Sequence, residues 1–135
     1  MKKIITMLCM LVCVCMMSAC MRGKTNEVKI YAVDSGIYSE QDISNACQTV
    51  RSYFEREYGG CSMTELYYIG DAENPSYAEF AGRIGADEVI VLVSEYRVSD
   101  KPSDPSLMPG STCSGWNWIL GRKKGGDWKL IDQGY

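Results

Sequence analysis

Residues 39–60, SEQDISNACQTVRSYFEREYGG, decide the fold, because they carry the strongest helix pattern in the chain. Ser39 and Asp42 have the spacing of a capping box, in which each side chain binds the other residue's backbone N–H. After this start, apolar side chains recur at helical spacing, at Ile43, Ala46, Cys47, Val50 and Phe54. Side chains so spaced share one face of a helix. The sequence therefore predicts a helix over 39–58, ended by Gly59–Gly60, that packs on a sheet.

The strands of that sheet are predicted on both sides of the helix. Alternating or continuous apolar patterns predict strands at 28–33, 62–70, 88–99, 115–123 and 128–133. Segment 88–99 is apolar on both faces in its first half, which is typical of a central strand. A short helix is predicted at 74–84, where Ser76 and Glu79 have capping-box spacing. Residues 99–111, rich in Pro, Ser and Asp, predict a long loop.

The pairing of the last two strands follows from the segregation of their side chains. A three-residue loop at 124–126 places Lys123 opposite Asp127 and Trp118 opposite Asp132. One face then collects apolar side chains, namely Trp116, Trp118, Leu120, Trp128 and Leu130. A loop of two or four residues mixes Lys and Arg into this face instead. We therefore predict the three-residue loop and a tryptophan-rich face that points at the long helix.

The first twenty residues have the features of an export signal. Residues 1–3, MKK, give a positive start, residues 4–17 contain a single polar side chain, and small residues follow. The tetrapeptide MSAC at 17–20 resembles the lipobox of bacterial lipoproteins. This resemblance implies a signal peptide at 1–19, lipid attachment at Cys20, and a place at the cell membrane on the extracytoplasmic side. An uncleaved membrane anchor and simple secretion are the alternatives.

Composition argues against several classes of function. The chain has 135 residues and a formal net charge of -3, with no basic run beyond residues 122–124, so we expect no nucleic-acid partner. It contains no histidine, which excludes Ser-His-Asp and Cys-His nucleophile activation and imidazole metal sites. We therefore expect no cofactor, no metal and no catalytic residue.

Three cysteines follow residue 20, at Cys47, Cys61 and Cys113. Because the number is odd, at most one disulfide can form within the chain. We favour buried free thiols, which pack as small apolar side chains do. A Cys61–Cys113 disulfide between strands is the alternative.

The order of these elements resembles the cystatin-like and NTF2-like folds, and three segments resemble a group of small uncharacterised bacterial lipoproteins. These segments are GCSMTEL at 60–66, ADEVIVL at 86–92, and WNWIL at 116–120 together with 128–135. The resemblance implies an α+β fold, in which a curved antiparallel sheet of about four to five strands packs on one long helix, plus one short helix. It divides the chain into the signal at 1–19, a lipidated tether with a possible first strand at 20–37, and a domain at 38–135.

Aromatic side chains are the candidates for a pocket between the long helix and the sheet. They are Tyr67, Tyr68, Tyr96, Trp116, Trp118 and Trp128. Aromatic walls suit apolar ligands or sugar rings, but the same residues can instead fill the core. Glu95 shares a strand face with Arg97, and in an NTF2-like pocket it is the candidate general base. The alternative for this pair is a solvated surface ion pair.

Three functions remain open on the sequence alone. The first is a lipid-anchored, non-catalytic module that binds a protein or a small ligand outside the membrane. The second is an NTF2-like enzyme that uses Glu95, and the third is a structural or assembly partner of another envelope protein. Residues 122–124 (RKK) with Lys129 form a small basic patch that could touch anionic lipid headgroups, or could only keep a hairpin tip soluble.

Overall fold

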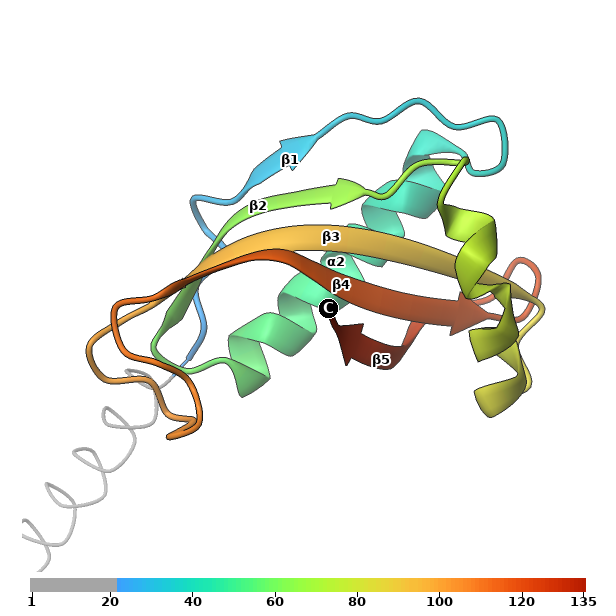
Figure 1. Cartoon of the computed structure of the whole chain (residues 1–135). Coiled ribbons are helices and arrows are strands. Elements are labelled where there is room, and N and C mark those ends of the chain that lie inside the picture. Colours follow the sequence, from blue (N-terminus) through green and yellow to red (C-terminus); the bar gives the residue numbers. More distant parts are fainter. Residues whose placement is uncertain (1–21) are drawn as a thin grey trace, which may run out of the picture.

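The computed structural model describes residues 22–135, so the predicted signal peptide and lipid attachment at Cys20 lie outside the described residues. The described chain folds into one sheet with helices on both of its faces (Figure 1). Its elements are β1 (Lys29–Tyr31), α2 (Glu40–Glu57), β2 (Cys61–Tyr68), the 3-10 helix η1 (Asn74–Arg83), β3 (Glu88–Val98), β4 (Thr112–Arg122) and β5 (Lys129–Gly134). The predicted α+β class is therefore confirmed.

The sheet is mixed, and the prediction of an antiparallel sheet is wrong at its first strand. The strand order is β1-β2-β3-β4-β5, with β1 parallel to β2 and every later pair antiparallel. The connection between the two strands explains this direction. After β1, helix α2 returns the chain to the end of the sheet at which β1 started, so β2 runs in the same direction as β1. Parallel neighbours require such a crossover. The long strands β3 and β4 curve around α2 (Figure 1).

The long helix begins and packs as the sequence predicts. The Ser39 hydroxyl accepts a hydrogen bond from the Asp42 N–H at 3.0 Å, and the Asp42 carboxylate accepts one from the Ser39 N–H at 3.0 Å. The buried side chains of α2 face the sheet, and they are Ala46, Cys47, Val50 and Phe54. After the helix, Gly60 has φ +78°, and a Cβ there would lie 2.6 Å from the Lys101 carbonyl oxygen. Glycine is therefore required at this turn.

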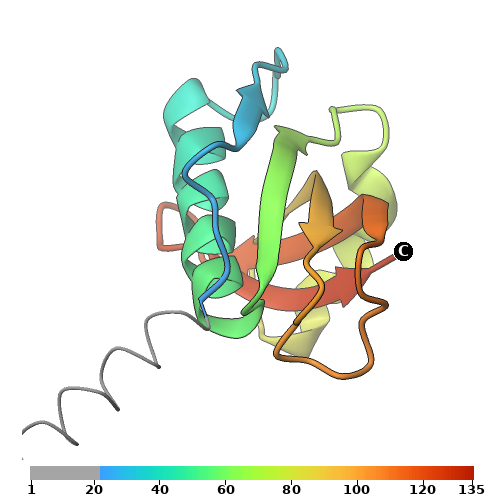
Figure 2. The same cartoon turned by 90° about the vertical axis from the view of Figure 1, so that its left-hand side faces the viewer.

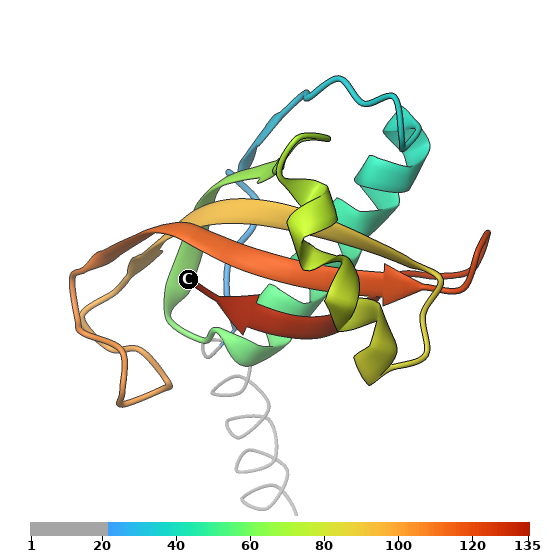
Figure 3. The same ribbon diagram turned by 45° about the vertical axis from the view of Figure 1, so that its right-hand side comes forward.

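The short helix differs from the prediction in its type and in its start. It is a 3-10 helix, and Glu73, at the N-cap position just before it, makes no side-chain cap, so the predicted capping box of Ser76 and Glu79 is wrong. Its start is held by Asn74, which is buried. The Asn74 amide donates to the Val89 carbonyl and accepts from the Val91 N–H, both at 2.9 Å. Tertiary contacts with β3 thus replace a local cap. The helix η1 lies across the face of the sheet opposite α2, which we call the outer face (Figure 3).

The predicted pairing of the last hairpin is correct next to the turn, and it is wrong further along the two strands. Leu120 lies opposite Leu130, as the three-residue loop predicts, but a bulge then places Trp118 opposite Gln133. The extra residue in β5 turns Gln133 toward α2 and leaves Asp132 on the outer face. Asp132 there accepts a hydrogen bond from Arg83 of η1 at 2.6 Å.

The folded unit begins before residue 38, where the sequence placed the domain boundary. The Gly23 N–H donates to the Glu55 carbonyl at 3.0 Å, and Lys24 forms an isolated bridge with Ser62 of β2. The Thr25 side chain is buried and donates to the Glu55 carboxylate. Residues 23–25 of the predicted tether are therefore part of the fold, packed at the C-terminal end of α2.

Candidate ligand groove

A groove of about 700 Å³ lies between α2 and the chain segment that contains β1. One wall is the face of α2 from Glu40 to Arg51, and the other is formed by residues 30–35. The two walls run side by side (Figure 2). This volume falls within the roughly 300–1,000 Å³ of typical ligand sites. We call this feature the β1–α2 groove.

The floor of the β1–α2 groove is apolar and rigid. Cys47 and Tyr38 line it while being only 2% and 7% exposed. The Tyr38 ring packs edge-on against Tyr68 and Trp128, and its hydroxyl donates to the Val89 carbonyl at 2.7 Å. Burial raises the pKa of the Cys47 thiol to about 11, so this side chain is neutral at physiological pH.

The wall after β1 is fixed by a single carboxylate. Asp71 accepts hydrogen bonds from the Ser35 hydroxyl at 2.6 Å, the Gly36 N–H at 2.7 Å and the Tyr68 hydroxyl at 3.0 Å. The bond from Ser35, followed by that from Gly36, lowers the pKa of Asp71. The Ser35 hydroxyl also accepts from the Tyr38 N–H at 2.9 Å. The shape of this wall is thus set before any ligand binds.

The two ends of the groove have opposite charge. Asp34 and Glu40 line the end where α2 begins, and Arg51 lines the other end, about 16 Å further along the helix axis. Arg51 is oriented by Thr25, whose hydroxyl and carbonyl oxygens accept from its guanidinium at 3.3 and 3.4 Å. An extended ligand with a positive and a negative end fits this distribution of charge.

The groove is bordered by a strand edge that has no neighbour. Within the described chain β1 pairs with β2 alone, because it is the first strand of the sheet. An edge strand presents free backbone N–H and C=O groups to a ligand. In β1 this edge is accompanied by the exposed apolar side chains of Ile30 and Tyr31. A ligand in the groove can thus reach main-chain hydrogen-bonding groups and an apolar floor together.

The structure places most of the predicted pocket aromatics in the core between α2 and the sheet. Tyr68, Tyr96, Trp118 and Trp128 are buried, and Trp116 is half-buried against Tyr96. The rings of Tyr96 and Trp118 pack against aromatic rings of α2 and the residue after it, at centroid separations of 5.4–6.3 Å, namely Tyr53, Phe54 and Tyr58. The sixth candidate, Tyr67, lies edge-on to Tyr31 on the outer face of the sheet.

Glu95 is not brought together with these aromatic side chains. It points from β3 to the face opposite α2, where it accepts hydrogen bonds from the Thr64 hydroxyl at 3.0 Å and the Ser114 hydroxyl at 2.9 Å. Arg97 lies exposed on the same face. Among residues 22–135, therefore, Glu95 is partnered by two hydroxyl groups and forms no ion pair with Arg97.

The predicted basic patch loses its first member to the interior. The Arg122 side chain is 10% exposed and donates to Asp42 at 2.9 Å and to Glu88 at 2.6 Å. Its guanidinium carbon lies 4.1 Å from the ring centroid of Trp128. Arg122 thus joins β4 to β3 and to the start of α2, and of the predicted basic patch only Lys123, Lys124 and Lys129 remain exposed.

The Cys61–Cys113 disulfide does not form, and all three described cysteines are free. Cys61 lies on β2 and Cys113 on β4, with β3 between these strands. Two strand spacings are about 9.6 Å, whereas the Cα atoms of a disulfide lie roughly 4.4–6.8 Å apart. Cys47 and Cys61 are buried, as free thiols that pack with apolar side chains.

The sequence pattern does not predict the β1–α2 groove. It indicates a possible strand, a turn and a helix face, which only the fold brings together. Comparison of the chain with protein-family models, with curated proteins and with solved structures found no match.

Neither helix in the described part of the chain has the length and apolar character needed to cross a membrane.

Proposed function

We propose that this protein is a lipid-anchored, extracytoplasmic binding module whose ligand site is the β1–α2 groove. The lipobox-like residues 17–20 support the anchor at Cys20 and the place on the outer side of the membrane. The preformed apolar floor and the volume of the groove support binding. The observation on which the proposal depends is that an edge of β1, unpaired within residues 22–135, borders this floor.

The ligand that best fits the groove is an extended peptide segment of a partner protein. Such a segment adds as a strand to a free sheet edge, where main-chain hydrogen bonds supply affinity and alternate side chains enter pockets. Tyr38, Ile43 and Cys47 offer an apolar surface for these side chains. The acidic end at Glu40 and the basic end at Arg51 set the direction of the peptide. Recruitment of an envelope protein follows from this mode of binding.

The proposal includes a relation to the cystatin-like and NTF2-like folds. A long helix packed on a curved sheet whose later strands are antiparallel supports it. The parallel β1 is the feature on which this chain departs from the predicted architecture. The same departure creates the second wall of the groove.

Photo-crosslinking in intact cells tests the binding site. A photo-crosslinking amino acid is placed at Ser44, which lines the groove, and in a matched protein at its exposed neighbour Asn45, which does not. We expect a discrete adduct from position 44 that is digested by protease and is absent from position 45. Equal adducts at both positions, or none from either, would contradict a site in the groove.

The nature of the ligand is decided by the same adduct. A protease-resistant adduct with the mass of a small molecule would replace the peptide by a small ligand in the same groove. Ile43→Asp adds a charge to the groove floor, and we expect it to abolish the adduct at position 44. The circular dichroism spectrum of this variant is recorded as a control for folding.

A further inference from the structure

The N-terminal end of the described chain lies beside the loop formed by residues 99–111. Gly23 is bonded to Glu55 at the C-terminal end of α2. The loop is bonded to the turn that follows this helix, since both the N–H and the hydroxyl of Ser103 donate to the Gly59 carbonyl at 2.9 Å. Both features lie at the same end of the domain (Figures 1 and 2).

The connection from this end to the proposed lipid is very short. Only two residues separate Cys20 from Gly23, and three residue steps span at most about 11 Å when fully extended. Gly23 is held at this end by the hydrogen bond to Glu55, and it packs so closely that a Cβ on it would lie 2.4 Å from the Phe54 carbonyl oxygen. A lipid on Cys20 therefore holds this end of the domain against the bilayer.

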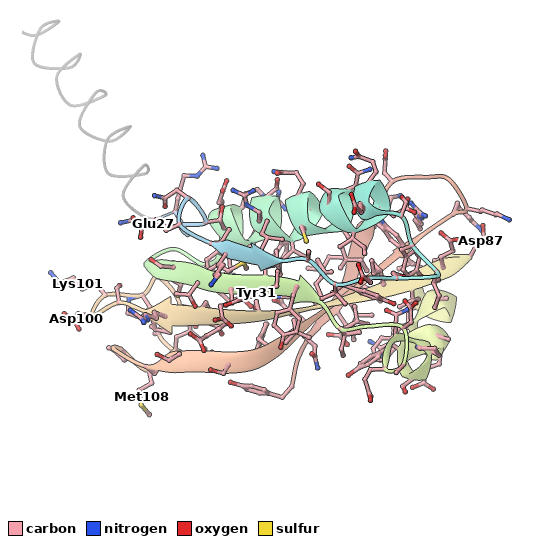
Figure 4. All side chains as sticks on the ribbon, turned by 90° about the horizontal axis from the view of Figure 1, so that it is seen from above. Glu27, Tyr31, Asp87, Asp100, Lys101 and Met108 are labelled. Carbon is pink, nitrogen blue, oxygen red and sulfur yellow. The ribbon has the colours of Figure 1, made fainter. Side chains whose placement is uncertain are left out.

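The loop at this end presents an apolar side chain on an ordered backbone. Met108 is 73% exposed and points away from the body of the domain (Figure 4). Its neighbour Leu107 packs against the core. The loop is closed by hydrogen bonds from the Gly110 N–H to the Val98 carbonyl at 3.0 Å and from the Ser111 N–H to the Met108 carbonyl at 3.2 Å. Burial of an exposed apolar side chain in the lipid interface is favourable.

Charge at this end does not select anionic lipid. Lys101, Asp100 and Glu27 are exposed there (Figure 4). Arg22, next to Gly23, is exposed as well. Arg22 also lies 3.9 Å from the Glu55 carboxylate. Because both signs are present, contact with a membrane here depends on the short connection and on the apolar side chain, so uncharged lipid suffices.

We propose that this end of the domain rests on the lipid surface, with Met108 in the interface. The proposal depends on the proposed lipid attachment at Cys20, and names the surface that this attachment brings to the membrane. The β4–β5 hairpin, with Lys123 and Lys124, lies at the opposite end of the sheet (Figure 1). It therefore points away from the bilayer, which favours lysines that keep the hairpin tip soluble over lysines that touch lipid headgroups.

Fluorescence quenching in vesicles tests this orientation. The full lipidated protein carries Cys113→Ser, to remove the half-buried thiol, together with Met108→Cys or, as the matched reference, Lys124→Cys. Cys47 and Cys61 are buried, and burial raises the pKa of each thiol to about 11, so they resist labelling. Each protein is labelled with a polarity-sensitive fluorophore and reconstituted into phosphatidylcholine vesicles with brominated acyl chains.

We expect the label at position 108 to lose fluorescence in brominated vesicles and the label at position 124 to lose none. Equal quenching at the two positions, or stronger quenching at 124, would overturn the orientation. Incorporation of labelled palmitate is measured on the same proteins and must disappear with Cys20→Ala. Failure of incorporation would overturn the lipid anchor itself, so the two failures are distinguishable.

A separate variant tests whether the short connection between Cys20 and Gly23 sets the orientation. Ten glycine and serine residues inserted between Arg22 and Gly23 leave Cys20 and the fold unchanged but lengthen the connection. We expect palmitate incorporation to persist while quenching at position 108 falls to the level at position 124. Full quenching in this variant would show that the short connection does not set the orientation.

Discussion

At the scale of single residues, Arg122 joins three parts of the domain. Its guanidinium binds Asp42 at the start of α2 and Glu88 at the start of β3, and it stacks on Trp128. The two carboxylate side chains are only 28% and 29% exposed. A charge held in this way stabilises its partners, and its removal leaves them partly buried without compensation.

Replacement of Arg122 is expected to destabilise the fold strongly. Arg122→Met keeps an apolar side chain over Trp128 but leaves Asp42 and Glu88 unpaired, and we expect a loss of about 3 kcal/mol in the free energy of unfolding. Urea denaturation followed by tryptophan fluorescence measures this loss. Lys123→Met, at the exposed next position, is the control and should change the free energy by less than about 0.5 kcal/mol. Equal losses in the two variants would contradict the role of Arg122.

The pairing of Asp42 makes stability depend on pH. The hydrogen bond from Arg122, followed by bonds within the capping box, lowers the pKa of Asp42 in the folded state. Between its folded and unfolded pKa values the unfolded chain binds more protons, so stability rises with pH there. The contribution is fully present above the unfolded pKa of about 3.9, and it is lost as pH falls through the folded value.

We therefore expect Asp42→Asn to flatten the acid limb of the stability curve. Thermal melting between neutral pH and pH 3 measures the midpoint for the variant and for the native chain. The native midpoint should fall more steeply below pH 4 than that of the variant. Asp127→Asn, at an exposed position of the hairpin, is the control. A slope unchanged by Asp42→Asn would show that its pKa is not lowered by folding.

At the scale of elements, each helix starts by a different means. Local hydrogen bonds stabilise the start of α2, since Ser39 and Asp42 bind each other's backbone across one turn. Tertiary hydrogen bonds stabilise the start of η1, since the Asn74 side-chain amide bonds to the backbone of β3. Capping patterns in sequence detect the first kind only, because they record neighbours along the chain. The bulge in β5 is likewise not detectable from capping or polarity patterns. It accompanies tertiary hydrogen bonds between the Gln133 amide and the hydroxyl groups of Tyr58 and Tyr53, at 2.5 and 3.1 Å.

Replacement of Asn74 tests the tertiary start of η1. Asn74→Ala leaves the buried Val91 N–H without its partner, whereas the Val89 carbonyl keeps the hydrogen bond from the Tyr38 hydroxyl. One unpaired buried group costs about 1–3 kcal/mol, so we expect a loss of about that size in the free energy of unfolding, measured by urea denaturation. Ser76→Ala removes the hydroxyl of the predicted capping box, which does not form, and should be close to neutral. A larger loss in Ser76→Ala than in Asn74→Ala would contradict this account.

At the scale of the whole molecule, the parallel β1 gives the domain its groove. The crossover through α2 leaves β1 at the sheet edge beside that helix. Asp71, which follows β2, then fixes the wall between β1 and α2 through Ser35 and Gly36. The groove thus depends on a contact between residues 35 positions apart in the sequence.

Loss of this contact is expected to loosen the groove wall without unfolding the domain. Asp71→Asn keeps one acceptor oxygen but cannot satisfy both Ser35 and Gly36. We expect faster amide hydrogen exchange at residues 36–38 and unchanged exchange in β3, measured by mass spectrometry. Asp104→Asn, in the loop at the other end, is the control. Exchange at 36–38 that does not differ from the control would show that Asp71 does not hold the wall.

Features that depend on near neighbours along the chain can be predicted from the sequence. The long helix with its capping box, the central β3, the turn-proximal pairing of the last hairpin and the burial of Trp118 and Trp128 all follow from local patterns of polarity. These patterns persist in the fold because one apolar face per element must be buried. The α+β class follows from the order of these elements.

The parallel direction of β1, the bulge in β5, the burial of Arg122 and the β1–α2 groove cannot be predicted from local patterns. Each depends on residues far apart in the chain that meet only when the sheet closes on α2. The partners of Arg122 lie 34 and 80 positions away, and the groove joins a strand edge to the face of a helix. Periodicity records which way a side chain faces, but it does not record which distant group that side chain will meet.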